Sequence, residues 1–167
     1  MKASVIFSTY NSEAWLEKTI WGFSAQEETD FEIIIADDGS RPATKELIDA
    51  LRPQVKMPII HVWQEDNGFQ KSQILNKAIV AATTDYLIFT DGDCIPRPDL
   101  LAVHSAMARP GRFLSGGYLK LPMSTSEAIT RDDIMAGRAT DYAWLRLHGT
   151  PASVQARARS RAGSSKP

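Results

Sequence analysis

The chain has 167 residues, of which 43% are hydrophobic and 23% charged, and its formal net charge at pH 7 is −1. This length favours a single domain, and the near-neutral charge gives no indication of a nucleic-acid partner. The single cysteine, Cys94, excludes an intramolecular disulfide, and no apolar run approaches the ~20 residues that a transmembrane helix needs. Because the N-terminus also lacks the apolar stretch of a signal peptide, we expect a cytoplasmic location, with attachment to the inner face of a membrane as the alternative.

Strand and helix signals alternate along the first part of the chain. In chain order they predict a strand at 3–8, a helix at 13–25, a strand at 31–36, a helix at 43–51 and a strand at 58–63. Ser12 is a candidate cap for the first helix, and Pro53 ends the second.

The same alternation continues after Asn67-Gly68. The pattern predicts an amphipathic helix through Ile74 and Ala82, a strand at 85–90, a helix at 98–108, a strand at 113–121 and a helix at 133–147. Pro98 suits the first position of its helix, and Gly116-Gly117 interrupts the last strand. Repeated strand–helix units predict an α/β fold, with a mostly parallel open sheet covered by helices on both faces.

The end of the chain differs in composition from the rest. We expect one domain over residues 1–150 and a basic segment over 151–167. The last seventeen residues contain no acidic residue and four basic ones: Arg157, Arg159, Arg161 and Lys166. Because this segment has too few apolar residues to order itself, we predict a disordered tail rather than an anchor for acidic lipid or nucleic acid.

Polar clusters follow three of the predicted strands. They are Thr9-Tyr10-Asn11, Asp37-Asp38-Gly39-Ser40 and Asp91-Gly92-Asp93. Parallel strands bring their carboxyl ends to one edge of a sheet, where ligands of open α/β sheets collect, so these clusters are expected to converge. Several carboxylates at one edge favour a hard divalent cation, Mg²⁺ or Mn²⁺, with an anionic partner such as a diphosphate.

These clusters and their neighbours resemble the inverting family 2 glycosyltransferases, which bind nucleotide sugars on a GT-A fold. The matching runs are residues 4–11, 32–40, 64–69, 74–79 and 86–93, with Pro96 after them. Order and spacing agree over about residues 1–120. Gly68-Phe69 and residues 113–117 are similar to members that build bacterial surface polysaccharide or lipopolysaccharide core.

The resemblance implies a donor nucleotide site made of Thr9, Tyr10, Asn11, Asp38, Asn67 and Asp91. Asp38 matches the carboxylate that contacts uracil or ribose. Asp91 and Asp93 match the family's Asp-x-Asp motif, in which the first carboxylate faces the ribose and the second binds the Mg²⁺ or Mn²⁺ that bridges the diphosphate. The implied activity is transfer of a sugar from a nucleotide-diphospho-sugar to a saccharide or lipid-linked acceptor.

One departure from the family pattern concerns the phosphates. Many relatives have an arginine immediately before Asn76, where this chain has Leu75. Lys71 or Lys77 is the candidate replacement, and a solvated helix face is the alternative for both lysines.

A second departure concerns the acceptor half, which in the family holds the general base. We match no segment after residue 120 to that half, and Asp132 or Asp133 is expected to cap a helix rather than act as a base. The alternative function is therefore a nucleotide-sugar-binding domain without turnover.

A phosphatase of the haloacid dehalogenase type also ends a strand in Asp-x-Asp. That motif usually opens its domain, and the alternative leaves the Asp37-Asp38-Gly39-Ser40 cluster unexplained. None of the three histidines has zinc-ligand spacing, and Cys94 is expected to act as a small buried apolar residue rather than a nucleophile.

Overall fold

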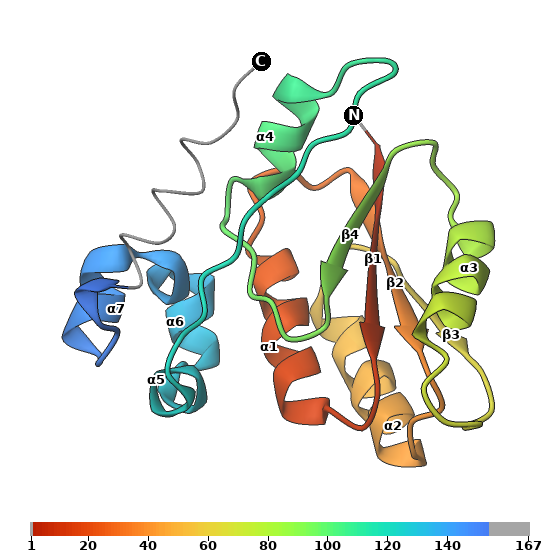
Figure 1. Cartoon of the computed structure of the whole chain (residues 1–167), viewed down its shortest axis with the longest axis horizontal. Helices are drawn as coiled ribbons and strands as arrows, with labels where there is room; N and C mark the ends of the chain where they lie inside the picture. Colours follow the sequence, from red (N-terminus) through yellow and green to blue (C-terminus); the bar gives the residue numbers. More distant parts are fainter. Residues whose placement is uncertain (1, 154–167) are drawn as a thin grey trace.

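The computed structural model describes residues 2–153, which form a four-stranded parallel sheet in the order β3-β2-β1-β4 (Figure 1). The strands are β1 (Ala3–Thr9), β2 (Phe31–Asp37), β3 (Ile59–Trp63) and β4 (Leu87–Asp91). Each is an apolar run with β-branched residues, as a strand buried between two layers requires. The prediction of an α/β fold with a parallel open sheet is confirmed.

Helices cover both faces of this sheet (Figure 1). They are α1 (Glu13–Ser24), α2 (Pro42–Leu51), α3 (Lys71–Ala81), α4 (Leu100–Met107), α5 (Met123–Ala128), α6 (Arg131–Met135) and α7 (Tyr142–Leu147), with 3-10 turns at Arg52–Gln54 and Arg138–Thr140. Within residues 2–153, none of these helices combines the length and apolar character that crossing a membrane requires. The predicted basic segment 151–167 lies outside the described residues, apart from its first three.

The alternation of side chains along the strands produces two cores. Val5 and Phe7 of β1 face the larger cluster, which includes Leu16 of α1. Ile6, between them in sequence, faces the smaller cluster against Ile74 of α3. Fully burying one such side chain stabilises the fold by about 1.5–3 kcal/mol, so the two faces together hold the strands in register.

The three short C-terminal helices pack beside α1. The guanidinium of Arg131 lies 3.6 Å from the centre of the Trp21 ring. Lys18 Nζ donates to the carbonyl oxygens of Ser126 at 2.6 Å and Glu127 at 3.0 Å. Ile134 belongs to the larger core. Residues 123–150 therefore share the hydrophobic core of the sheet.

Two predicted elements are wrong. Residues 113–121 form no strand but an irregular segment, in which Phe113 is 89% exposed. The segment is locally apolar, but Gly116-Gly117 weakens extended structure and no strand pairs with it. The predicted helix 133–147 is split into α6 and α7, because Gly137 takes the left-handed conformation at φ 74°.

Smaller differences occur at helix ends. The helix expected from Pro98 begins at Leu100, and α5 was not predicted. Ser12 lies at the N-cap position of α1, but its hydroxyl donates to the Tyr10 carbonyl instead of accepting a helix N–H. Asp133 forms a capping box with Thr130 at the start of α6. This agrees with the prediction that Asp132 or Asp133 caps a helix.

Candidate functional site

The carboxyl ends of the four strands lie in one row. In the sheet register Thr9 is paired with Asp37, Ser8 with Asp91, and Asp37 with Trp63. The turns that follow β1, β2 and β4 therefore start side by side at the same edge (Figure 1). The convergence predicted from the three polar clusters is what the strand register produces.

Gly92 lets the acidic turn after β4 lie directly against β1. A Cβ at this position would be 2.4 Å from the carbonyl oxygen of Ser8, closer than any side chain tolerates. The Gly92 carbonyl accepts from the hydroxyl of Thr19 on α1 at 3.0 Å. With this backbone fixed, the carboxylates of Asp91 and Asp93 on either side of the glycine are exposed to solvent.

Asp91, Asp93 and Cys94 offer ligand atoms that all lie within 4.8 Å of one another. Burial and then the two neighbouring carboxylates raise the pKa of the Cys94 thiol. Sulfur is also a soft ligand that Mg²⁺ and Mn²⁺ do not prefer. The two carboxylates are hard oxygen donors of the kind that Mg²⁺ and Mn²⁺ prefer. Lys71 Nζ donates to Asp91 Oδ1 at 2.7 Å. The residues present thus fit a divalent cation held by two carboxylates.

Asp37 fixes the turn after β2 from inside the protein. Its Oδ2 lies 2.8 Å from His61 Nε2, and its Oδ1 accepts the backbone N–H of Ser40 at 2.8 Å. Burial alone raises the pKa of this carboxyl, but the hydrogen bonds from His61 and Ser40 outweigh it and lower the pKa below its usual value. Gly39 follows at φ 95°, and a Cβ there would be 2.6 Å from the Cα of Asp66. The turn therefore packs on the loop that follows β3.

Asp38 is 6% exposed, and both of its carboxylate oxygens have protein partners. Oδ1 accepts from Gln64 Nε2 at 2.6 Å, and Oδ2 accepts the backbone N–H of Gln70 at 2.9 Å. Its own N–H donates to the Thr9 carbonyl at 3.0 Å. In this arrangement Asp38 ties together the ends of β1, β3 and the start of α3.

The turn after β1 carries the other residues expected at the donor nucleotide. Thr9 is 6% exposed, and its hydroxyl has no hydrogen-bond partner within the described structure. The hydroxyl of Tyr10 donates to Asp66 Oδ2 at 2.9 Å, and this bond, followed by the charge of Asp66, raises the pKa of Tyr10. Asn11 is left-handed at φ 46°, and its Oδ1 accepts the backbone N–H of Arg41 at 2.9 Å.

Two predicted residues lie at the margin of this group. Asn67 is exposed on the loop between β3 and α3. Lys77 is exposed on α3, six residues beyond Lys71, which corresponds to roughly 9 Å further along the helix axis from the acidic edge.

Sequence reasoning missed the residues that act as partners. Gln64, Asp66 and Gln70 contact predicted site residues through the bonds above, and His61 was considered only as a zinc ligand. Gln64 and Asp66 lie inside the matched run 64–69, which was the available signal. The pairing of His61 with Asp37 follows from the register of β2 and β3, so no local pattern could have revealed it.

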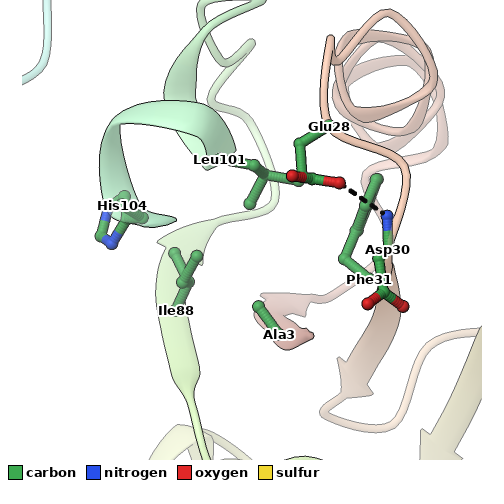
Figure 2. Close-up of a pocket in the computed structure, with 7 residues that line it drawn as sticks. All are labelled: Ala3, Glu28, Asp30, Phe31, Ile88, Leu101 and His104. Carbon is green, nitrogen blue, oxygen red and sulfur yellow. Dashed lines mark hydrogen bonds between the residues drawn. The ribbon is translucent and has the colours of Figure 1, made fainter. Parts of the chain in front are cut away.

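A separate hollow lies at the opposite, amino edge of the sheet (Figure 2). Its lining includes Ala3 and Phe31, the first residues of β1 and β2, and His104 of α4. His104 Nδ1 lies 2.9 Å from the Tyr86 hydroxyl, and burial lowers the pKa of His104. The hollow leaves no space for a water molecule, so it is a packing feature rather than a ligand site.

The comparisons with known proteins agree with this geometry. The profile described as Glycosyl transferase family 2 matches residues 4–119. An uncharacterized glycosyltransferase of Nostoc sp., alr2836, is 35% identical over 101 residues, which cover 60% of this chain and 31% of that protein. The poly(ribitol-phosphate) β-N-acetylglucosaminyltransferase TarS of Staphylococcus aureus is 28% identical over 95 residues, covering 56% of this chain and 16% of TarS.

Solved structures give the same result for the fold. TarS 1–349 in complex with UDP-GlcNAc matches with a TM-score of 0.54 and 25% identity, over 64% of this chain and 30% of that one. The mannosyltransferase PcManGT of Pyrobaculum calidifontis, in complex with GDP-Man and Mn²⁺, matches with a TM-score of 0.54 and 24% identity, over 65% and 32%. The fold is thus of the GT-A type.

The chain spans about a third or less of the length of the curated relatives it matches. The family profile nevertheless covers more than half of the chain, including the four strands apart from Ala3 and the acidic turns at their ends. The chain therefore belongs to glycosyl transferase family 2.

Proposed function

We propose that this chain binds a nucleotide-diphospho-sugar donor at the carboxyl edge of its sheet and contributes that donor site to a metal-dependent sugar transfer. The observation that carries the proposal is the alignment of the acidic turns after β2 and β4 on either side of β1. A donor of this kind has a nucleoside at one end and a diphosphate at the other. Carboxylates suit a nucleoside directly and a diphosphate through a cation.

The nucleoside end belongs, in this proposal, at the turns after β1 and β2 and at the loop before α3. The side chains of Tyr10 and Asn67 are exposed there, and the Tyr10 ring can contact a base while its hydroxyl stays bonded to Asp66. Thr9 carries a buried hydroxyl that has no partner within the described structure. Asp38 has both oxygens engaged, so a direct contact with uracil or ribose requires one of its bonds to Gln64 or Gln70 to open. Asn11 holds the turn in shape through Ser40 and Arg41.

The diphosphate end belongs at Asp91 and Asp93. Asp93, with Asp91, would hold Mg²⁺ or Mn²⁺, which when bound neutralises the charge that develops on a departing nucleoside diphosphate. Lys71 supplies a further positive charge at this position, and Lys77 remains the second candidate for the phosphates. In this proposal Asp91, which pairs with Ser8 of β1, also faces the ribose.

The proposed reaction is inverting transfer to a saccharide or lipid-linked acceptor in polysaccharide synthesis, in the cytoplasm or at the inner face of a membrane. The similarity to TarS, which is named as a poly(ribitol-phosphate) β-N-acetylglucosaminyltransferase, supports a polymeric acceptor. The described residues offer no carboxylate that we assign as the general base.

Calorimetric titration with UDP and GDP, each with and without Mn²⁺, tests the donor site directly. We expect Mn²⁺-dependent binding of UDP that falls at least tenfold in Asp93→Ala. The matched control is Asp85→Ala, because Asp85 is an exposed aspartate at the amino edge next to β4. Equal UDP affinity in wild type and Asp93→Ala, or equal affinity with and without Mn²⁺, would contradict the proposal.

A second measurement separates transfer from binding alone. UDP-sugar hydrolysis or transfer above background by the purified chain supports the transferase, whereas tight UDP binding without any turnover supports the alternative of a binding domain.

A further inference from the structure

Lys71 occupies the position at which a cation would approach Asp91. It is the first residue of α3, and its Nζ lies 2.7 Å from Asp91 Oδ1. The side chains of Lys71 and Asp91 are 38% and 62% exposed, so water reaches both partners of the pair. Within residues 2–153, no other lysine or arginine is bonded to Asp91 or Asp93.

We propose that Lys71 is an exchangeable counter-ion. It neutralises Asp91 in the free protein and moves to the diphosphate when the metal ion and the nucleotide arrive together. The inference rests on the proposed donor site, and it adds a prediction that the site alone does not make: metal and nucleotide binding should be coupled through one lysine.

The coupling follows from the charges at the edge. Asp91 and Asp93 together carry two negative charges, and the Lys71 ammonium halves that net charge while it stays paired. A divalent cation arriving alone must compete with the ammonium for Asp91 Oδ1. A diphosphate that arrives with the metal offers the Lys71 ammonium other oxygen atoms to bind. The ammonium then no longer competes with the metal ion for Asp91 Oδ1.

The chemistry of lysine suits this exchange. Its ammonium is a compact charge on a flexible four-carbon stem, and it can turn between neighbouring acceptors without moving the backbone of α3. The backbone itself is fixed, because the N–H of Gln70 is bonded to buried Asp38. An exposed lysine–carboxylate pair stabilises weakly, so breaking it should change Mn²⁺ affinity only about two- to fivefold.

The test measures Mn²⁺ binding without nucleotide, by the loss of the free-ion electron paramagnetic resonance signal. Wild type, Lys71→Met, Lys71→Arg and Lys45→Met are compared. Lys45 is a matched control, because it forms an exposed lysine–aspartate pair with Asp49 on α2. We expect Lys71→Met to bind Mn²⁺ two- to fivefold more tightly than wild type, with Lys71→Arg and Lys45→Met within twofold of wild type.

The nucleotide side is measured on the same proteins by UDP titration at saturating Mn²⁺. We expect Lys71→Met to bind UDP at least threefold more weakly, while circular dichroism shows unchanged secondary structure. Equal Mn²⁺ affinity in wild type and Lys71→Met, alongside normal UDP binding by wild type, would overturn the exchange and leave the donor site intact. Failure of every variant to bind UDP would remove the proposed function, and the diphosphate part of this inference with it.

Discussion

The carboxylate of Asp38 accepts the backbone N–H of Gln70 at 2.9 Å, across 32 positions of sequence. Gln70 is the N-cap residue of α3, and Lys71 follows it. This hydrogen bond fixes the start of α3 to the turn after β2. Changes at Asp38 should therefore affect both the nucleoside end and the diphosphate end of the proposed donor site.

Asp38→Ala should destabilise the protein by about 2–4 kcal/mol, because it leaves the buried Gln64 amide and the Gln70 N–H without their acceptor. Asp38→Asn should cost less, since Gln64 can flip and present Oε1, which has no partner in the described structure. Chemical denaturation followed by circular dichroism measures both. Equal losses for the two variants would argue against a hydrogen-bonding role.

Gly92→Ala should destabilise the protein by about 1–3 kcal/mol, because the new methyl group meets the Ser8 carbonyl oxygen at 2.4 Å. The strain acts on the turn that carries Asp91 and Asp93, so Mn²⁺-dependent UDP binding should weaken too. Gly116→Ala is the matched control, since nothing lies within 4 Å of a Cβ there. We expect denaturation midpoints to separate the two variants clearly; a midpoint for Gly92→Ala like that of Gly116→Ala would refute the close approach.

Asp133 should make stability depend on pH in the acid range. Its hydrogen bonds to Thr130, opposed by burial and helped by Arg138, lower its pKa from 3.8 to about 2. The pKa of Asp133 is lower in the folded state than in the unfolded state. Its ionised carboxylate therefore contributes fully to the free energy of unfolding above pH 3.8, and this contribution is lost as the pH falls towards 2. Asp133→Asn should therefore be less stable than wild type at pH 7, and the difference should disappear near pH 2.

Denaturation midpoints at pH 7, 5, 3.5 and 2.5 measure this dependence. Asp132→Asn serves as the control, because its exposed carboxylate lies in the first turn of the same helix and takes no part in the capping box. A constant difference between wild type and Asp133→Asn across this range would contradict the assigned pKa.

Arg131→Met should loosen the packing of α6 on α1, because the guanidinium lies over the face of buried Trp21. The expected loss is about 0.5–1 kcal/mol, with a change in tryptophan fluorescence. A double-mutant cycle with Trp21→Leu, which removes the aromatic face, isolates the pair, and additive losses would mean that the two side chains do not interact.

The strands of the sheet could be predicted from the sequence, because each is an apolar run long enough to cross a buried layer. The sequence also predicted that the acidic turns lie at one edge of the sheet, since parallel strands share one carboxyl edge. It was misleading at residues 113–121, where local composition resembles a strand but no neighbouring strand supplies hydrogen bonds. It also missed the break at Gly137, because a single glycine within an apolar pattern does not reveal its own φ.

The roles of individual site residues were harder to predict than their positions. Asp38 was expected to face the nucleotide, and its expected contact remains a prediction, but the structure adds bonds to Gln64 and Gln70. The pairing of Lys71 with Asp91 joins residues 20 positions apart. Such contacts depend on how loops pack after the strands have formed, which no local pattern encodes.

The central position of β1 has a consequence for ligand length. Neighbouring strands lie roughly 4.8 Å apart, so β1 acts as a spacer that keeps the acidic turns of β2 and β4 about 10 Å from each other. In the proposed donor site, β1 would therefore lie under the middle of the donor, between a base beside Tyr10 and a diphosphate at Asp91 and Asp93.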